Sequence, residues 1–482
     1  MRKLSNGYVD FEVVRLFFLP LQICGHLCLS VAVFFLYFLI IPVYSLTMEK
    51  FFHIKESGSD VKTEVIAGLS TFMTMAYILA VNPLILSTCG MDFTKVFAAT
   101  AIASAISCFV MGFYANLPFA LSASMGVNAM FAYTICNAMG YSWQWGLTAV
   151  LMEGIIFILL TVTNLREAIV NCIPSTLKKA IGAGVGLFVA YIGLKNGNII
   201  VSDPATITAI NAEWFVGTPL LTILGVIITG ILIVKKVRGA ILVGILLVTL
   251  LGIPMGITKY AGGSYLPASP YFCEFSFSEI FTNQKTISDF IIITLTLLYV
   301  DMFNTVGTLI ACAGKSNMIK EDGTIPRTSE ALMSDAIGTT VGAVLGTSTI
   351  TTFVESSTGV AEGGRTGLTT IVVGILFLLS LFIEPIFGSI PAAASSSALI
   401  LVGCMMIAPM KDIDYSDYTE LIPAFLTVLM MICTSSISDG ILFGILSFVL
   451  IKAFTGHIKE VETMTWVVAG LFVIRIIIGI LS

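Results

Sequence analysis

Apolar runs of about twenty residues recur along almost the whole chain, and a helix of this length can cross the hydrocarbon core of a bilayer. A first series of seven runs lies near residues 64–88, 95–118, 120–138, 142–163, 178–195, 215–235 and 239–258. After a loop that extends to about Lys285, a second series lies near residues 287–313, 329–345, 346–362, 367–387, 389–410, 418–437 and 439–455. The pattern predicts an all-α polytopic membrane protein with seven spans in each of two repeats. A further run at 464–481 fits a final helix or an interfacial one.

The third run of each series departs from the aliphatic pattern. Residues 121–134 and 346–359 are rich in Ser, Thr and Gly in place of Leu and Ile. Paired interrupted segments at corresponding positions of two halves point to the binding site of a transporter. An odd number of spans in each half would make the repeats inverted. The fifth runs also correspond, because an Ile-Pro pair opens each of them.

The stretch 346–359 surrounds one carboxylate, Glu355, with hydroxyl side chains. Ser and Thr at this density offer the backbone competing hydrogen bonds, and a Glu at membrane depth costs about 3 kcal/mol. Non-helical backbone is tolerated at that depth only when it is buried in protein or lines a cavity. We therefore expect an irregular segment that lines a cavity. The alternative is a polar seam between closely packed helices.

Two other spans carry polar side chains that could meet this segment. Asp301 shares one helix face of the eighth span with three threonines, Thr294, Thr305 and Thr308, so this stripe is expected to face the protein interior. Asn128 follows Gly126, which would allow a tight turn and leave Asn128 near the start of a half-helix. A structural carboxylate paired with an amide or a Lys, and a simple N-cap, are the respective alternatives.

Other acidic residues in the spans are weaker candidates. Glu153 lies deep in the fourth span, where a coupling role and a structural role are both open. Asp335 and Glu64 lie near span ends, where a carboxylate at a helix N-terminus is ordinary. The main candidates, Asp301 and Glu355, could accept hydrogen bonds from a ligand or carry a proton. With Asn128 they suit a flat, polar, mostly uncharged ligand.

The composition agrees with a membrane protein and removes several other classes. The chain is 57% hydrophobic and 11% charged, with a mean hydropathy of +1.00. Its ten cysteines form no CxxC pair or Cys/His cluster, so neither a disulfide framework nor a metal site is indicated. No nucleophile-base arrangement, phosphate loop or nucleotide fingerprint is present, which argues against an enzyme. A net charge of -5 indicates no nucleic-acid partner.

Basic residues predict the orientation. With the Met48 end inside, most Lys and Arg residues of the loops fall on that side, whereas Lys95, Lys195, Lys259 and Lys285 fall on the other. This excess is the positive-inside pattern, so the inner side is expected to be cytoplasmic.

The first 47 residues differ from the rest. The run 16–44 is too long for a signal-peptide core and has no clear cleavage site. It is interpreted as an extra span, as an uncleaved signal anchor, or as sequence upstream of a true start at Met48.

Five stretches together resemble the adenine/guanine/hypoxanthine permease branch of the nucleobase-cation symporter-2 family. They are MEKFFHIKESGSDVKTEVIAGLSTFMTMAYILAVNP, SASMGVNAMFAY, LLYVDMFNTVGTL, SDAIGTTVGAVLGTSTITTFVESSTGVAEGGRTGLTT and SIPAAASSSALILVGCMM. The likeness runs from about Met48 to the C-terminus, and VESSTGVAEGGRTGLT is highly specific. Members of this branch usually begin near such an MEKFF segment, which favours the start at Met48.

The resemblance implies an architecture and a mechanism. It implies two inverted seven-span repeats, with a short strand and a half-helix in spans three and ten. A core domain would comprise approximately residues 64–163 and 287–387, and a gate domain approximately 178–258 and 389–455. Purine would bind between the broken spans and enter with a proton as the core moves like an elevator against the gate. The protein would lie in the cell membrane and need no cofactor beyond the proton gradient.

The resemblance also assigns residues. The purine-contacting positions of the family match Asn128, Asp301 and Glu355, and Gly126 and Ser356 are grouped with them as binding residues. Asp301, Glu355 and Glu153 are the proton-coupling candidates. Most members have a second Asp where this chain has Asn304, so coupling or specificity could differ here.

One alternative keeps the fold and changes the solute. A transporter or exchanger for another small polar or anionic solute would need a basic residue facing the half-helix N-termini, and the candidate site is acidic. The preferred purine, coupling to H+ or Na+, and homodimer formation are left open by the sequence.

Overall fold

The computed structural model describes Glu49 and residues 51–476, with gaps at 164–173, 204–205, 238, 261, 263–264, 283, 317, 319–326, 435, 463–464, 467, 471 and 474–475. The segment 1–47 lies outside the described residues, as does the greater part of the run 464–481, so the interpretations of both stay predictions. Contacts divide the chain into two units, Met1–Val61 and Lys62–Ser482. The second unit contains both series of spans.

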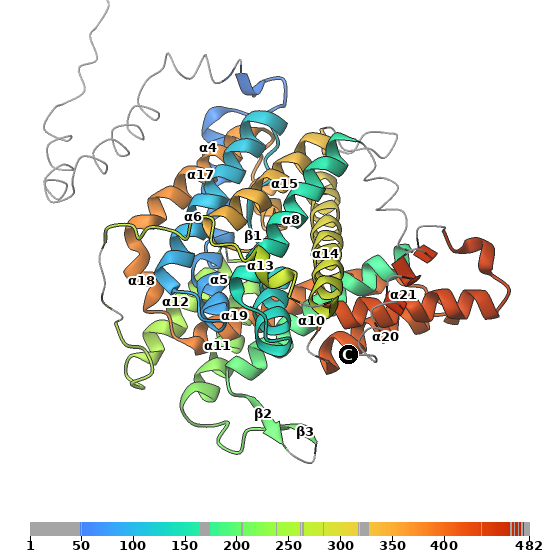
Figure 1. Cartoon of the computed structure of the whole chain (residues 1–482). Helices are drawn as coiled ribbons and strands as arrows, with labels where there is room; N and C mark the ends of the chain where they lie inside the picture. Colours follow the sequence, from blue (N-terminus) through green and yellow to red (C-terminus); the bar gives the residue numbers. More distant parts are fainter. Residues whose placement is uncertain are drawn as a thin grey trace, which may run out of the picture. The chain divides into compact units, whose positions relative to one another are not determined.

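The first series forms mostly helices, in the order that the apolar runs predict (Figure 1). Its elements are α4 (Val61–Met75), α5 (Ile78–Ser87), α6 (Phe93–Val110), η2 (Met111–Ala115), β1 (Leu121–Ala123), α7 (Met125–Ala129), η3 (Met130–Ala138), α8 (Trp143–Val162), α10 (Ser175–Asn196), α11 (Gly217–Val234) and α12 (Ala240–Gly252). A hairpin of β2 (Ile200–Asp203) and β3 (Ile207–Ile210) lies between α10 and α11. The third span is thus a short strand followed by a helix, as predicted.

The second series repeats this order. Its elements are α13 (Phe277–Ile280), α14 (Gln284–Ser316), α15 (Thr328–Leu345), β4 (Ile350–Thr352), α16 (Ser356–Ala361), α17 (Gly367–Ser380), η4 (Leu381–Ile383), α18 (Glu384–Gly388), α19 (Ala392–Met406), η5 (Ala408–Asp412), α20 (Tyr418–Cys433), α21 (Ile437–Phe454) and η6 (Ile458–Glu460). The tenth span again combines a strand with a short helix. The predicted fold class is therefore confirmed, including the position of both interruptions.

Eight helices in the described part of the chain are long and apolar enough to cross a membrane, by length and composition. Other spans are shorter or interrupted, as in α12, α20 and the two segments that contain strands. The chain is a multi-pass membrane protein. The helices of its broken spans are too short to be recognised as membrane-spanning by their length alone.

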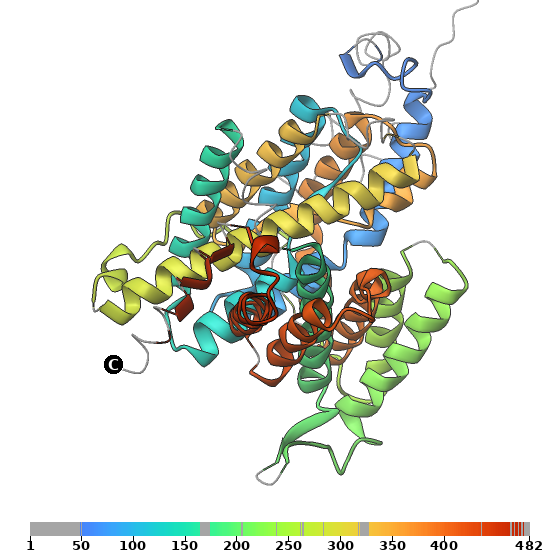
Figure 2. The ribbon, with the colours of Figure 1, turned by 90° about the vertical axis from the view of Figure 1, so that its right-hand side faces the viewer.

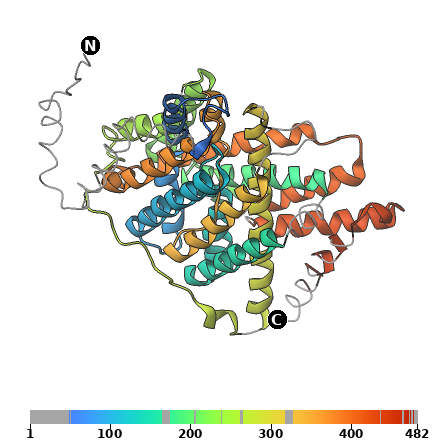
Figure 3. The same ribbon diagram turned by 90° about the horizontal axis from the view of Figure 1, so that it is seen from above.

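The helices pack as two groups. One comprises α5, α6, α8, α14, α15 and α17 around the short strands, and Figure 3 shows α6, α15 and α8 side by side. The other comprises α10, α11, α12, α19, α20 and α21, which pack on one another. In the view of Figure 2, the long helix α14 runs between the two groups. The assignment of these helices to a core domain and a gate domain stays a prediction.

Local chemistry ends the helices where the chain must become irregular. Gly346 stops α15 in the left-handed region, with φ 88°, where a residue without a Cβ is favoured. Asn116 also adopts the left-handed conformation, with φ 49°, and ends η2. The Asp92 side chain caps α6 by accepting from the Thr94 and Lys95 amides. The Thr94 hydroxyl donates to the same carboxylate, and these bonds hold the pKa of Asp92 below its usual value.

Candidate functional site

The two broken spans meet through their strands. β1 and β4 pair antiparallel, with Ser122 opposite Thr351 at the centre of the register. Hydrogen bonds from Ser124 N to Thr349 O and from Phe353 N to Ala120 O, both 2.9 Å, extend the pairing at its two ends. All residues of both strands are buried. Within the described ranges, this is the only sheet whose strands belong to two different spans, and it lies where the sequence predicts the site.

Asn128 connects the first broken span to the second. Its side chain is fully buried, and its Oδ1 accepts a hydrogen bond from the Ser348 hydroxyl, just before β4. Its own backbone amide donates to Ser124 O at 2.8 Å, so Asn128 lies within the helix and is no N-cap. The Nδ2 atom has no hydrogen-bond partner among the described residues. An amide donor is thus left for a further acceptor.

Glu355 directly precedes α16 and is partly exposed, unlike the strand before it. The Tyr77 hydroxyl donates to Glu355 Oε1 at 2.7 Å. Tyr77 is buried in the break between α4 and α5, and sequence reasoning missed it. A hydroxyl-bearing side chain inside the apolar run 64–88 was the available signal, but nothing in the run itself singles out the tyrosine at that position.

Gly126 and Ser356 each make a local contact that holds a broken span in place, and their role in binding stays a prediction. Gly126 does not adopt a positive φ, so the predicted tight turn at this glycine is wrong. It allows a close approach instead, because a Cβ at Gly126 would lie 2.3 Å from Val185 Cγ1 on α10. The Ser356 hydroxyl accepts from the Ala120 amide at 2.9 Å and so joins α16 to the chain before β1.

Asp301 faces the protein interior, as the polar stripe predicts. Thr294, Asp301 and Thr305 are all buried. Neither carboxyl oxygen of Asp301 has a hydrogen-bond donor within the described residues, so the alternative of a carboxylate paired with an amide or Lys is not what the structure shows. Asp301 interacts instead with two other acids, Glu153 and Asp335.

Those two acids are also fully buried. Glu153 Oε2 accepts from the Thr349 hydroxyl, and Asp335 Oδ2 accepts from the Thr305 hydroxyl, each at 2.7 Å. The expectation that Asp335 is an ordinary acid near a helix start is wrong, because it lies inside α15 and faces Asp301. Sequence alone placed it at a span end, since the beginning of that span could be set only approximately.

The predicted residues thus form three groups around one pair of strands. Asn128 bonds Ser348, Glu355 bonds Tyr77, and Asp301 meets two acids; no hydrogen bond joins Asn128, Asp301 and Glu355 directly in the described structure. Asn304 donates to Ser124 Oγ at 3.4 Å, next to α7. No group of three His, Cys, Asp or Glu side chains in the described part has a geometry that could hold a metal ion.

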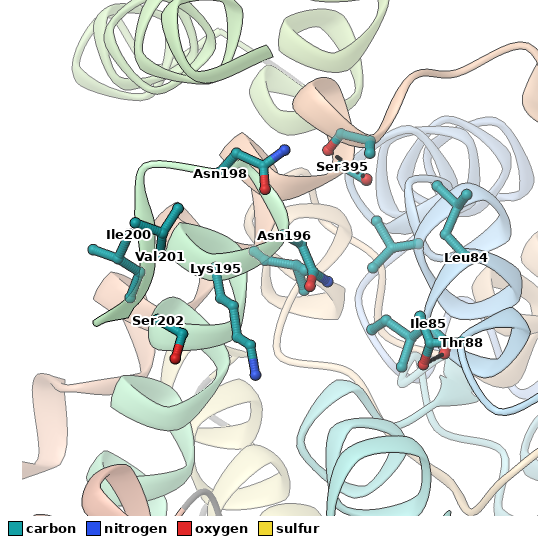
Figure 4. Close-up of a pocket in the computed structure, with 13 residues that line it drawn as sticks. Leu84, Ile85, Thr88, Lys195, Asn196, Asn198, Ile200, Val201, Ser202 and Ser395 are labelled. Atoms are coloured by element: carbon teal, nitrogen blue, oxygen red, sulfur yellow. Dashed lines mark hydrogen bonds between the residues drawn. The ribbon is translucent and has the colours of Figure 1, made fainter. Parts of the chain in front are cut away.

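A cavity of about 550 Å³ lies apart from these residues, between α5, the end of α10, β2 and the start of α19. Figure 4 shows Leu84 and Thr88 on one side and Lys195 and Asn196 on the other. Asn196 donates to the Tyr133 hydroxyl at 2.6 Å. Residues from both groups of helices line the cavity, and none of the predicted binding residues is among them.

Known proteins share most of this chain. The model of the permease family matches residues 62–443. The chain is 45% identical to a putative permease of Methanocaldococcus jannaschii over 89% of this chain and 98% of that protein. It is 40% identical to the guanine/hypoxanthine permease PbuG of Bacillus subtilis (89% and 99% covered) and 38% identical to the adenine permease AdeP of Escherichia coli (89% and 96% covered).

Solved structures with little sequence likeness share the fold. The transmembrane domain of the cyanobacterial bicarbonate transporter BicA matches with a TM-score of 0.60 at 14% identity, over 79% of this chain and 97% of that chain. A murine solute carrier 26 anion transporter, member A9, in the inward-facing state matches with a TM-score of 0.55 at 10% identity, over 94% and 74%. At these identities the likeness concerns the fold alone. The family model and the sequence relatives show that the chain belongs to the permease family of nucleobase-cation symporters-2, which includes adenine and guanine/hypoxanthine permeases.

Proposed function

We propose that this protein is a secondary active transporter that imports purine nucleobases by proton symport. The observation that carries the proposal is the 37–40% identity to two adenine permeases and two guanine/hypoxanthine permeases, over 89–90% of this chain. The transported base is adenine, guanine, hypoxanthine or more than one of these. The protein acts in the cell membrane, with the loops rich in Lys and Arg on the cytoplasmic side.

The side chains at the strands suit a purine. A purine edge presents ring nitrogens that accept hydrogen bonds beside N–H groups that donate them. Asn128 has a buried Nδ2 donor without a partner, and Glu355 offers an acceptor that is partly exposed. We assign substrate contact to Asn128, Glu355 and Asp301. Gly126 and Ser356 support this contact through the close approach to α10 and the link to Ala120.

The transport movement is proposed to be elevator-like. The strands and the acids belong to the group of helices that contains α14, whereas α10 and α19 belong to the other group. Near the cavity, the hydrogen bond from Asn196 of α10 to the Tyr133 hydroxyl of η3 would break in such a movement. In the proposed movement the first group carries the bound base past the second.

An anion transporter of the same fold is less well supported. The two structural neighbours are a bicarbonate transporter and an anion transporter, and they share only the fold with this chain. An anion needs a positive partner at the site. Lys55, Lys452, His53 and His457 form ion pairs with acidic side chains, and none of these four residues belongs to the strands or the acids.

Uptake of radiolabelled hypoxanthine, adenine and guanine tests the function. The full chain would be expressed in cells that lack purine transport, with a membrane-fraction assay to show insertion. We expect saturable uptake of at least one base, and its collapse on addition of a protonophore. Uptake that persists with the protonophore would remove proton coupling, and an inserted protein without any purine uptake would remove the substrate class.

A further inference from the structure

The half-helix α16 of the tenth span has only six residues, and Glu355 directly precedes it. The amides in the first turn of a helix and the carbonyls in its last turn have no partner within the helix. A helix of this length is therefore held in position by its surroundings, and its own hydrogen bonds contribute little. The described contacts show that α4 of the first span provides much of these surroundings.

One face of α4 forms a bed for α16 and for the chain that follows it. Ala67 and Thr71 are one turn apart on this face, and both are buried. A Cβ on Gly359, within α16, would lie 2.2 Å from Thr71 Oγ1 and 2.5 Å from the Ala67 carbonyl oxygen. The two helices thus approach more closely than a side chain at this glycine would allow. Glu64, one turn before Ala67, accepts from the Arg365 amide at 2.8 Å and holds the chain beyond α16.

Two hydrogen bonds from the first span fix the two ends of α16. After its last residue, Glu362 Oε2 accepts from the Ser70 hydroxyl at 2.8 Å. Before its first residue, Glu355 Oε1 accepts from the Tyr77 hydroxyl at 2.7 Å. Tyr77 lies at the break between α4 and α5, and only 1% of its surface is exposed. Packing therefore holds the phenol ring, and its hydroxyl reaches the carboxylate from a fixed position.

We propose that Tyr77 is a positioning residue for substrate binding, which holds the Glu355 carboxylate in the orientation that an N–H group of the base requires. This inference rests on the proposed function, in which Glu355 accepts a hydrogen bond from the base. A Glu side chain has several staggered rotamers, and the bond from Tyr77 selects one of them. The carboxylate has further lone pairs with which it can accept from the base. Tyr77 acts through Glu355 and needs no contact with the base itself.

The variant Tyr77→Phe tests this role, because it removes the hydroxyl and keeps the ring. Binding of radiolabelled hypoxanthine to the purified full-length protein gives Kd, and uptake by cells that lack purine transport gives KM and Vmax. We expect Kd and KM to rise about tenfold, the effect of losing a hydrogen bond to a charged group, with Vmax close to the wild-type value. Ser70→Ala is the matched control. It removes the hydroxyl that bonds an acid at the other end of α16, and it should leave Kd and KM unchanged.

A double variant separates positioning from a general loosening of the tenth span. Residues that act through one another have effects that do not add, whereas independent residues have additive effects. If Tyr77 acts through Glu355, Tyr77→Phe raises Kd in the otherwise wild-type protein and has little further effect in protein that already carries Glu355→Gln.

Each result has a defined meaning. A wild-type Kd for folded Tyr77→Phe overturns the proposal. An equal rise for Ser70→Ala also overturns it, because the effect would then come from the packing of α16. An undiminished effect of Tyr77→Phe beside Glu355→Gln overturns it as well. If Tyr77→Phe does not fold, para-fluorophenylalanine at position 77, which fills the space of the hydroxyl and cannot donate, is judged by the same measurements. Wild-type protein that reaches the membrane and takes up no purine shows instead that the proposed function has failed.

Discussion

The two broken spans share one architecture and differ in their chemistry. Both have a short buried strand followed by a helix, and the strands pair with each other. The first is held by neutral contacts: Ser122 bonds Ser104 at 2.7 Å, and Gly126 packs on Val185. The second lies among acids: Thr349 at one end of its strand donates to Glu153, and Glu355 follows the strand. At the other end, the Thr352 amide donates to Thr305 of α14, whose hydroxyl donates to Asp335.

The repeat accounts for the backbone that the two broken spans share, and the side chains are specific to each half. A pair of related segments explains the matching backbone, because both halves must satisfy their strand amides inside the membrane. It does not require matching side chains. We infer that the third span supplies a neutral, closely packed wall for the base, and that the tenth span responds to charge. Substitutions in the tenth span should then change coupling and affinity, and substitutions in the third span should change packing.

The largest expected effect is that of Glu355→Gln. The amide oxygen can still accept from the Tyr77 hydroxyl, so the fold should be kept, but the charge and one acceptor oxygen are lost. A hydrogen bond to a charged group is worth about 1.5–3 kcal/mol, which corresponds to about 10–100-fold in hypoxanthine uptake at low substrate concentration. Uptake in transport-deficient cells measures the effect.

The matched control for this variant is Glu362→Gln. Glu362 follows the same short helix and accepts from the Ser70 hydroxyl at 2.8 Å, a bond that a Gln oxygen can also make. It should keep uptake near the wild-type level. Equal uptake by Glu355→Gln and wild-type protein would show that the charge of the tenth span is not used.

A smaller effect, on stability, is expected for Gly126→Ala in the third span. The added Cβ would lie 2.3 Å from Val185 Cγ1, so α7 or α10 must shift. Overpacking of this kind costs about 1–3 kcal/mol. The melting temperature of the purified protein should fall, and Val185→Ala in the same chain should restore it by removing the clashing methyl group.

Gly182→Ala on α10 is the control for packing. Among the described residues, no atom beyond its neighbours in the same helix lies within 4 Å of a Cβ at this position, and Ala in a helix is favoured over Gly by up to about 1 kcal/mol. The melting temperature should stay constant or rise. If Gly126→Ala is as stable as Gly182→Ala, the close approach of α7 and α10 does not set the packing of the third span.

The order of the spans and both interruptions could be predicted from sequence because hydrophobic length and Ser/Thr density are local signals. The environments of individual acids could not. Asp335 was assigned to a span end, since the start of α15 lies beside a polar loop without a sharp boundary. Its partner Asp301 is 34 positions away in the sequence, and no periodicity links two different helices. Tyr77 was missed for the same reason, because only the fold brings it to Glu355.

Gly126 shows a second limit of the sequence. A glycine before a polar residue at a helix start fits a turn and a close helix contact equally well, and the two uses differ only in φ and in what lies opposite. The structure has an ordinary φ and Val185 opposite. By contrast, the half-helix position of Asn128 was correctly predicted, because a break in the aliphatic pattern at residue 121 is enough to place a helix start.

The smallest expected effect is that of Thr349→Val, which tests the connection between the tenth span and the buried acid Glu153 of α8. Valine keeps the shape of the side chain and removes the 2.7 Å bond to Glu153 Oε2; leaving a buried acceptor without its donor costs about 1–3 kcal/mol. Proton-driven accumulation of hypoxanthine in proteoliposomes should fall by a few-fold, with counterflow kept. Thr352→Val is the control, because the buried Thr352 hydroxyl has no hydrogen-bond partner among the described residues and this residue lies opposite Leu121 in the strand pair. A connection between strand and acids predicts a loss for the first variant alone. If the two variants accumulate hypoxanthine equally, the hydrogen bond between the strand and the acid does not contribute to coupling. The tenth span would then resemble the third in its chemistry as well as in its backbone.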